Sequence, residues 1–220
     1  MDMGDARQII AKRAAREISD GMIVNLGIGI PSLVPDFLDS SIRVFFQAEN
    51  GILGMGPTPP AQTADGNLSN AAGYPVTLLH GGSYFDSALA FGMIRKGCVD
   101  VSILGALQVS ANGDLANWIV PGKRVPGVGG AMELAYGAKN LIALMTHCEK
   151  DGRPKILKNC SLPITTFRCV KKIITDMAVF TIDNAGLHLE EIMPGFTLQD
   201  IRQHTEAEFS VSPDISQTKP

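Results

Sequence analysis

Residues 22–31 read MIVNLGIGIP, a short apolar run that ends in a glycine-rich turn. Apolar residues bounded by turn signals are typical of a buried strand, so we predict a strand over Met22–Leu26. Pro31 suits the first turn of a helix, which predicts a short helix over Ser32–Leu38. The preceding segment, Asp5–Ser19, has apolar residues on one face and closes at an Asp-Gly pair, as an amphipathic helix does. The chain therefore opens as helix, strand and helix.

The alternation of strands and helices continues along the chain. A second strand, Arg43–Ala48, runs into Glu49-Asn50-Gly51, and a hairpin is predicted around Asn112-Gly113. The glycine-rich segments Gly51–Pro60 and Pro121–Gly130 are predicted as loops. Further strands are expected at Val76–Leu79, Val99–Leu104, Asn140–Met145, Met177–Ile182 and Leu187–Ile192, and further helices at Ser83–Arg95, from Ala131 onward and at Leu198–Thr205. This pattern predicts an α/β fold: an open, mostly parallel sheet with helices on both faces and added antiparallel hairpins. We expect residues 1–220 to form a single domain.

Composition excludes several classes of protein. The 220 residues are 45% hydrophobic and 19% charged, with a net charge of −3, which fits a globular domain and excludes a disordered chain. No basic block is present to follow a phosphate backbone, so nucleic acid is not expected as a partner. The longest uncharged stretch, residues 66–85, is too polar for a membrane helix, and the N-terminal residues do not resemble a signal peptide. We therefore expect a cytoplasmic protein.

Cysteine and histidine spacing gives no support to metal or thiol chemistry. The cysteines lie at positions 98, 148, 160 and 169, and the histidines at 80, 147, 188 and 204. None of these spacings forms a CxxC, HxH or HExxH pair from which metal or redox sites are built. We therefore expect no metal site, and cysteines that behave as small hydrophobic residues.

Two motifs are candidates for the functional site. Gly27 and Gly29 follow a strand, as in a dinucleotide-binding turn, but Ser32 stands where the third glycine belongs and Pro31 constrains the backbone there, so a tight turn is the better interpretation. The second motif, AENGILGMGP at residues 48–57, places Glu49 at the carboxyl end of a strand, where open α/β sheets bind ligands. Position alone leaves Glu49 either a catalytic carboxylate or an ordinary loop residue.

A resemblance to a known family favours catalysis. The stretches that carry it are NLGIGIP at 25–31, AENGILGMGP at 48–57, GALQV at 105–109, NWIVPGK at 117–123 and VPGVGGAMEL at 125–134. Together, and in this order, they resemble the β subunit of the family I 3-oxoacid coenzyme A transferases, which include the succinyl-CoA:3-ketoacid, acetate and butyrate-acetoacetate enzymes. The chain departs from the usual family pattern at Ala48, where serine is usual, and at Glu133, where aspartate is common.

The resemblance implies a role for each candidate site residue. Glu49 would attack an acyl-CoA, and the resulting anhydride would give a glutamyl-CoA thioester in a ping-pong reaction that needs no metal or permanently bound cofactor; coenzyme A is a substrate. Gly129 and Gly130 would supply a backbone donor near the CoA thiol, or be turn glycines only. Asn25 would contact CoA or steady the site, or instead cap the GIGIP turn. The remaining candidates for substrate or CoA binding are Asn50, Gly51, Gln108 and Lys123. Lys123 would offer charge to a CoA phosphate, or instead be a solvated loop lysine, as lysines on exposed loops usually are.

The resemblance also implies a partner. Family members are built from two similar α/β units, so we expect this chain to be inactive alone and to act with an α subunit, as α2β2, on an acyl-CoA and a free carboxylate. The acids that are exchanged stay open. Two other functions stay open from the residues alone: a sugar-phosphate isomerase or deaminase, such as ribose-5-phosphate isomerase or glucosamine-6-phosphate deaminase, with Glu49 as general base, or a ligand-binding domain without catalysis.

Overall fold

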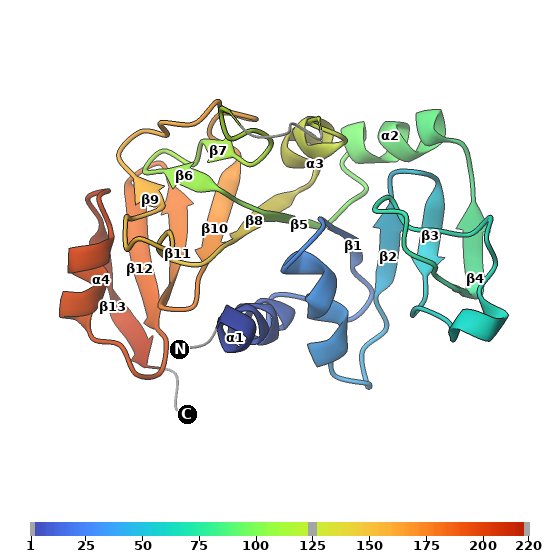
Figure 1. Ribbon diagram of the computed structural model, residues 1–220, viewed down its shortest axis with the longest axis horizontal. Coiled ribbons are helices and arrows are strands. Elements are labelled where there is room, and N and C mark those ends of the chain that lie inside the picture. The colour runs from blue at the N-terminus through green and yellow to red at the C-terminus, as the bar shows by residue number, and fades with distance from the viewer. Residues whose placement is uncertain (1–2, 123–126, 218–220) are drawn as a thin grey trace.

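A computed structural model describes residues 3–122 and 127–217, and a long twisted sheet runs through its whole width (Figure 1). Within these residues the sheet has ten strands in the order β13-β12-β11-β10-β8-β5-β1-β2-β3-β4. The strands in its middle are parallel to one another: β10 (Val170–Ile174), β8 (Asn140–Leu144), β5 (Val101–Gly105), β1 (Ile23–Leu26) and β2 (Phe45–Ala48). Antiparallel strands extend both ends: β3 (Ile52–Met55) and β4 (Leu78–Tyr84) beside β2, and β11 (Ala178–Asp183) and β12 (Gly186–Ile192) beside β10, with β13 (Ser210–Gln217) parallel to β12. The predicted α/β sheet is confirmed.

Helices cover both faces of the middle strands (Figure 1). Helix α1 (Met3–Ala15) and the 3-10 helix η1 (Pro31–Phe37) pack on one face, while α2 (Ser87–Arg95) and α3 (Ala131–Gly137) lie on the other. Neighbouring residues of β5 show the two layers: Ile103 packs with α1, and Leu104 packs with α2 and α3. Side chains that alternate between two buried faces are expected where helices cover a parallel sheet on both sides.

Three smaller elements complete the described residues. The 3-10 helix η2 (Ala61–Thr63) lies between β3 and β4, and α4 (Leu198–His204) precedes β13. Strands β7 (Leu115–Ala116), β6 (Gln108–Ser110) and β9 (Ile156–Leu157) form a separate small sheet. The antiparallel β6–β7 pair is the hairpin predicted around Asn112-Gly113. None of the helices in residues 3–122 and 127–217 has the length and apolar character needed to cross a membrane.

The prediction of a loop over Gly51–Pro60 was wrong for its first half, which forms β3. Glycines that looked like turn signals instead let two strands approach closely: a Cβ on Gly54 would lie 2.9 Å from the Gly82 Cα of β4. Strand β4 therefore continues through Gly81 and Gly82, well beyond the predicted end at Leu79. Because β4 occupies these residues, α2 starts at Ser87 instead of Ser83, capped by Asp86, whose side chain accepts from the Leu89 amide at 2.8 Å.

Partly buried ion pairs hold α1 against strands far away in the sequence. Arg13 donates to Glu17 at 2.6 Å and to Glu191 of β12 at 2.5 Å, and Lys172 of β10 donates to Glu17 at 2.6 Å. Burial alone would raise the pKa of Glu17, but the hydrogen bonds from Lys172 and Arg13 outweigh it and hold that pKa below its ordinary value. Glu17 therefore stays ionised and fixes the end of α1.

His147 is a second buried titratable group. It is fully buried, and its ring nitrogens lie 2.9 Å from Thr175 Oγ1 and 3.0 Å from Thr205 Oγ1. Burial, helped by the nearby charges of His204 and Lys155, lowers the pKa of His147 from 6.5 to about 3. The imidazole is therefore neutral in the folded protein and bridges two hydroxyl groups.

Candidate active site

Glu49 lies at the carboxyl end of β2, at the turn that leads into β3. Its side chain is half-buried. The turn depends on Gly51, which has a φ of +119° and whose added Cβ would overlap the Phe85 carbonyl oxygen. The Gly51 amide donates to the Ala48 carbonyl at 3.0 Å, and the Phe85 amide donates to the Gly51 carbonyl at 3.0 Å. Only glycine fits this position, so Gly51 fixes the direction in which Glu49 leaves the strand.

Asn25 of the neighbouring strand β1 contacts the Glu49 carboxylate. Asn25 and Gln47 are register partners on β1 and β2, and each is 1% exposed. The Asn25 side-chain nitrogen Nδ2 lies 3.2 Å from Glu49 Oε2, 2.7 Å from Gln47 Oε1 and 3.0 Å from the Gln47 carbonyl oxygen. The structure therefore brings Asn25 to Glu49, where it can donate to one carboxylate oxygen.

Gly130 lies on the other side of the carboxylate. It is the N-cap of α3, with φ −83° and ψ 1°. A Cβ on Gly130 would lie 3.2 Å from Glu49 Cγ and 3.3 Å from Glu49 Oε1. A Cβ on Gly129, whose φ is +56°, would have no atom within 4 Å. The structure thus places the two oxygens of Glu49 differently: Oε2 beside Asn25, and Oε1 beside the backbone of Gly130.

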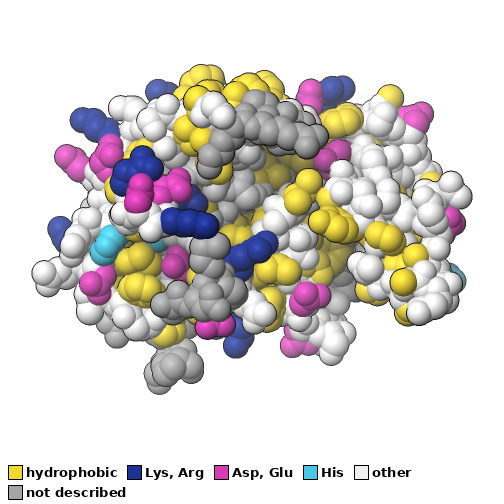
Figure 2. All heavy atoms as spheres, in the orientation of Figure 1, with side chains coloured by type: hydrophobic (Ala, Val, Ile, Leu, Met, Phe, Trp, Pro, Cys, Tyr) yellow, Lys and Arg dark blue, Asp and Glu magenta, His cyan; other side chains and the backbone are white. Residues whose placement is uncertain are grey.

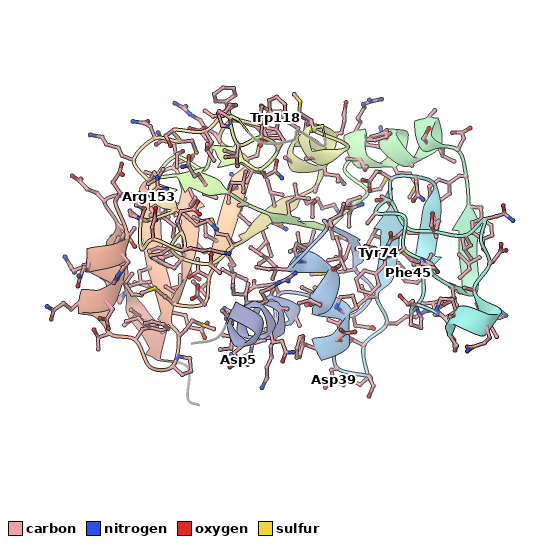
Figure 3. The ribbon with its side chains drawn as sticks, viewed as in Figure 1. Asp5, Asp39, Phe45, Tyr74, Trp118 and Arg153 are labelled. Atoms are coloured by element: carbon pink, nitrogen blue, oxygen red, sulfur yellow. The ribbon has the colours of Figure 1, made fainter. Side chains whose placement is uncertain are left out.

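Glu49, Gly129 and Gly130 line a large cavity of about 1460 Å³. Figure 2 shows it as a hollow near the middle of one face, with hydrophobic side chains inside. The walls come from the turn after β1, from η1, from β2, and from residues within the segments 55–58, 70–79 and 127–134. Two lining residues are largely exposed: Tyr74, labelled in Figure 3, is 62% exposed, and Ile28 is 67% exposed. The carboxylate therefore faces a volume that can hold an organic substrate of considerable size.

Three of the other sequence candidates, Asn50, Gly51 and Gln108, lie apart from this cavity. Asn50 donates to the Ser69 carbonyl at 2.7 Å and, with Gly51, lines a separate hollow of about 420 Å³. Gln108 accepts from the Ser161 and Leu162 amides, each at 2.9 Å, and so holds that loop; it lines neither hollow. Lys123 lies outside the described residues. Substrate or CoA contacts by these residues stay predictions.

Sequence reasoning missed Gln47. A glutamine in RVFFQA looks like an ordinary polar strand residue, yet it is buried and lies two positions before Glu49, so both side chains lie on one face of the sheet. Its signal in the sequence was the pairing of two amide residues, each near the end of a predicted parallel strand. That pairing becomes visible only when the register of β1 and β2 is known.

The fold and the site define an open α/β protein that presents a carboxylate at the carboxyl end of a parallel strand, against a glycine turn and a large cavity. The family model named coenzyme A transferase matches residues 7–204, and the chain belongs to this family. The resemblance to this family that the motifs predicted is confirmed by the family model, and the relatives named as beta or B subunits confirm the kind of subunit.

Several relatives agree with this placement. The chain is 55% identical to the probable coenzyme A transferase subunit beta of Bacillus subtilis, over 98% of this chain and 100% of that protein. It is 47% identical to the acetate CoA-transferase subunit beta of Escherichia coli, over 96% and 97% of the two chains. It is 48% identical to the human mitochondrial succinyl-CoA:3-ketoacid coenzyme A transferase 2, over 96% of this chain but 41% of that protein. The fold resembles that of the E. coli O157:H7 acyl-CoA transferase YdiF, with a TM-score of 0.77, 24% identity, and coverage of 97% of this chain and 43% of that chain.

Proposed function

We propose that this chain is the glutamate-bearing subunit of an enzyme that moves coenzyme A between an acyl-CoA and a free carboxylate, with Glu49 as the nucleophile. The observation that carries the proposal is the environment of Glu49. One oxygen is within reach of the Asn25 amide at 3.2 Å, and the other lies against the Gly130 backbone at the edge of the large cavity. A carboxylate is a weak nucleophile, so its reactivity depends on such positioning.

The reaction would proceed in two exchanges. Glu49 attacks the thioester carbonyl carbon, the C–S bond breaks, and CoA leaves as the thiolate with the electron pair, which yields an acyl-glutamyl anhydride. The thiolate then attacks the glutamyl carbonyl carbon and releases the first acid as its carboxylate, so that Glu49 carries CoA as a thioester. An incoming carboxylate repeats both steps in reverse, which gives ping-pong kinetics. No net proton is consumed in either exchange.

Backbone amides near Gly129 and Gly130 suit the developing oxyanion. A well-placed donor of this kind contributes roughly 3 to 4 kcal/mol in enzymes of known mechanism. The absence of a Cβ at Gly130 leaves room for the acyl group beside Glu49 Oε1. A larger residue there would meet the nucleophile itself.

We further propose that the active enzyme contains a separate α subunit, as an α2β2 assembly. The support is the name of the B. subtilis relative, a subunit beta, and the length of the human relative, of which this chain covers 41%. The purified chain alone should show no transfer, and mass measurement of the reconstituted enzyme should give two copies of each chain. Full activity of the chain alone would refute the need for a partner.

The acceptor acid is proposed only as a class, a 3-oxoacid such as acetoacetate or another short-chain carboxylate. Relatives at 47% and 48% identity carry names that specify acetate and a 3-ketoacid, so identity does not separate these substrates. One methylene in a pocket changes binding by only about 1 to 3 kcal/mol. A panel of carboxylate acceptors with one acyl-CoA donor tests the class.

The decisive experiment detects CoA on Glu49. The complex is incubated with an acyl-CoA and no acceptor, and a peptide containing Glu49 is examined by mass spectrometry for added CoA and for its reduction by borohydride. Glu49→Gln should carry no CoA and show no transfer. Glu133→Gln is the matched control, because Glu133 is an exposed carboxylate on α3 that pairs with Arg95 at 2.9 Å. An unmodified Glu49, or an active Glu49→Gln enzyme, would refute the covalent mechanism.

A further inference from the structure

Three buried polar side chains form a row across the middle of the sheet. Ser102 of β5, Asn25 of β1 and Gln47 of β2 are successive register partners, so their side chains lie on the same face. Their exposed fractions are 0%, 1% and 1%. Leu141 and Leu53 continue the row on either side. This polar row therefore lies between apolar neighbours in the middle of the sheet, and its Asn25 side chain reaches Glu49.

The row is not explained by stability. Ser102 Oγ, Asn25 Oδ1 and Gln47 Nε2 are buried, and within the described residues none of these atoms has a hydrogen-bond partner. A buried polar atom without a partner destabilises a fold, and apolar residues of the same shape cost less. Residues that weaken the fold are expected where they serve a functional site. Of the three, Asn25 and Gln47 are linked to Glu49 by hydrogen bonds, whereas Ser102 Oγ has no hydrogen-bond partner within the described residues.

The orientation of the Asn25 amide follows from its neighbours. The Gln47 carbonyl oxygen can only accept a hydrogen bond, so the atom of Asn25 that lies 3.0 Å from it is the donor Nδ2. Because Nδ2 then also faces the Gln47 side chain, Gln47 presents its acceptor Oε1, at 2.7 Å. The same Nδ2 reaches Glu49 Oε2 at 3.2 Å. If the Asn25 amide were rotated by about 180°, its Oδ1 would face Glu49 Oε2, and the two oxygens would repel each other.

We propose that Gln47 is a positioning residue that acts through Asn25: its Oε1 holds the Asn25 amide with Nδ2 toward Glu49, which fixes Oε2 and leaves Oε1 as the attacking oxygen beside Gly130. The inference rests on the proposed function of Glu49. Gln47 itself need not touch the substrate for this role.

The test is a double-mutant cycle on the complex with its α subunit. Gln47→Met keeps the length of the side chain and removes the acceptor, and Asn25→Ala removes the donor. The rate of glutamyl-CoA formation at saturating acyl-CoA is measured for each variant and for the pair. We expect Gln47→Met to lower this rate about tenfold, with the KM for acyl-CoA within about twofold of wild type, as for loss of orientation alone. The double variant should be no slower than Asn25→Ala.

Controls separate positioning from folding. Ser102→Ala removes the third polar group of the row, which does not contact Glu49, and should leave the rate unchanged. The melting temperature of Gln47→Met should not fall below that of wild type, because a buried atom without a partner is removed. Gln47→Asn, whose shorter side chain withdraws the carbonyl from Asn25, provides a second variant and should show the same loss.

The outcomes are distinct. A wild-type complex that forms no glutamyl-CoA refutes the proposed function and this inference with it. A wild-type complex that forms the adduct, together with a Gln47→Met variant that is equally fast, overturns the positioning role alone. A loss that is equally large with and without Asn25 also overturns it, because Gln47 would then act by another route.

Discussion

Replacement of Gly130 by alanine should slow the enzyme without unfolding it. The backbone at Gly130, with φ −83° and ψ 1°, accepts an L-residue without strain. The added Cβ, however, would lie 3.2 Å from Glu49 Cγ, 3.3 Å from Glu49 Oε1 and 3.4 Å from Phe91 Cε1. Carbon contacts are ordinarily about 3.5 to 4.0 Å, so the carboxylate must move by a few tenths of an ångström.

The magnitude follows from the precision that positioning requires. A misplacement of about 1 Å costs about a hundredfold in rate, so a shift of a few tenths of an ångström plus crowding of the acyl group should cost about tenfold, or about 1.4 kcal/mol. The free energy of unfolding should change by less than about 1 kcal/mol, as for an exchange of cap residues.

The assay is rapid-quench measurement of glutamyl-CoA formation in the complex, with thermal unfolding of the same preparations. Gly92→Ala is the matched control, because Gly92 lies in α2, one residue from Phe91, and has nothing within 4 Å of an added Cβ. This control should keep the wild-type rate and gain about 0.5 to 1 kcal/mol in stability. A Gly130→Ala enzyme as fast as wild type would refute the placement of Glu49 against Gly130, and an equal loss in Gly92→Ala would refute its specificity.

Three further predictions concern the fold. Gly51→Ala, at φ +119° and against the Phe85 carbonyl, should lower the free energy of unfolding in urea by at least about 3 kcal/mol. Gly73→Ala, at φ +80° with open space around it, should lower it by only about 1 kcal/mol. Equal losses would contradict the close approach of Gly51 to Phe85. Because the pKa of Glu17 is lowered in the fold, its carboxylate contributes stability above its ordinary pKa of 4.5, and this stability is lost as the pH falls through the folded-state value. Glu17→Gln should therefore flatten the acid side of the curve of unfolding free energy against pH. An unchanged slope would count against the ion pairs. The pKa of His147 is lowered to about 3, so the stability that the neutral ring contributes above its ordinary pKa of 6.5 should be lost at up to about 1.4 kcal/mol per pH unit as the pH falls from 6.5 toward 3. The NMR resonances of His147 should not titrate between about pH 5 and 8. A titration midpoint near 6.5 would contradict its burial.

Local patterns predicted the middle of the molecule well. Met22–Leu26 and Val99–Leu104 are mainly apolar stretches followed by turn residues, and they overlap the parallel strands β1 and β5. Glu49 could be placed at a strand end for the same reason, since Gly51 marks the turn. These features depend on residues that are close together in the sequence, which a periodic pattern can record.

The edges and the polar row could not be predicted in this way. Strand β10 reads VKKII, and its two lysines interrupt the apolar pattern by which a buried strand is predicted. The strand is recognised only from its pairing with β8 and β11. Strand β3 contains Gly54, which is explained only by the approach of β4. The contact of Asn25 with Gln47 depends on the register between two strands, and the register is a property of the folded sheet. The reach of Gly130 to Glu49 likewise joins segments about eighty residues apart.

The ion pairs of α1 have a consequence for how the chain is made. Arg13 and Glu191 are 178 positions apart, and β8 and β10, which α1 covers, belong to the later half of the chain. During synthesis from the N-terminus, the apolar face of α1, with Ile10 and Ala14, emerges long before the strands that bury it. Helix α1 can pack early against η1, but its contacts with β8 and β10 form only after those strands have been made. A truncated chain that ends before β10 would thus lack the Lys172–Glu17 ion pair and leave part of the apolar face of α1 exposed, which favours aggregation.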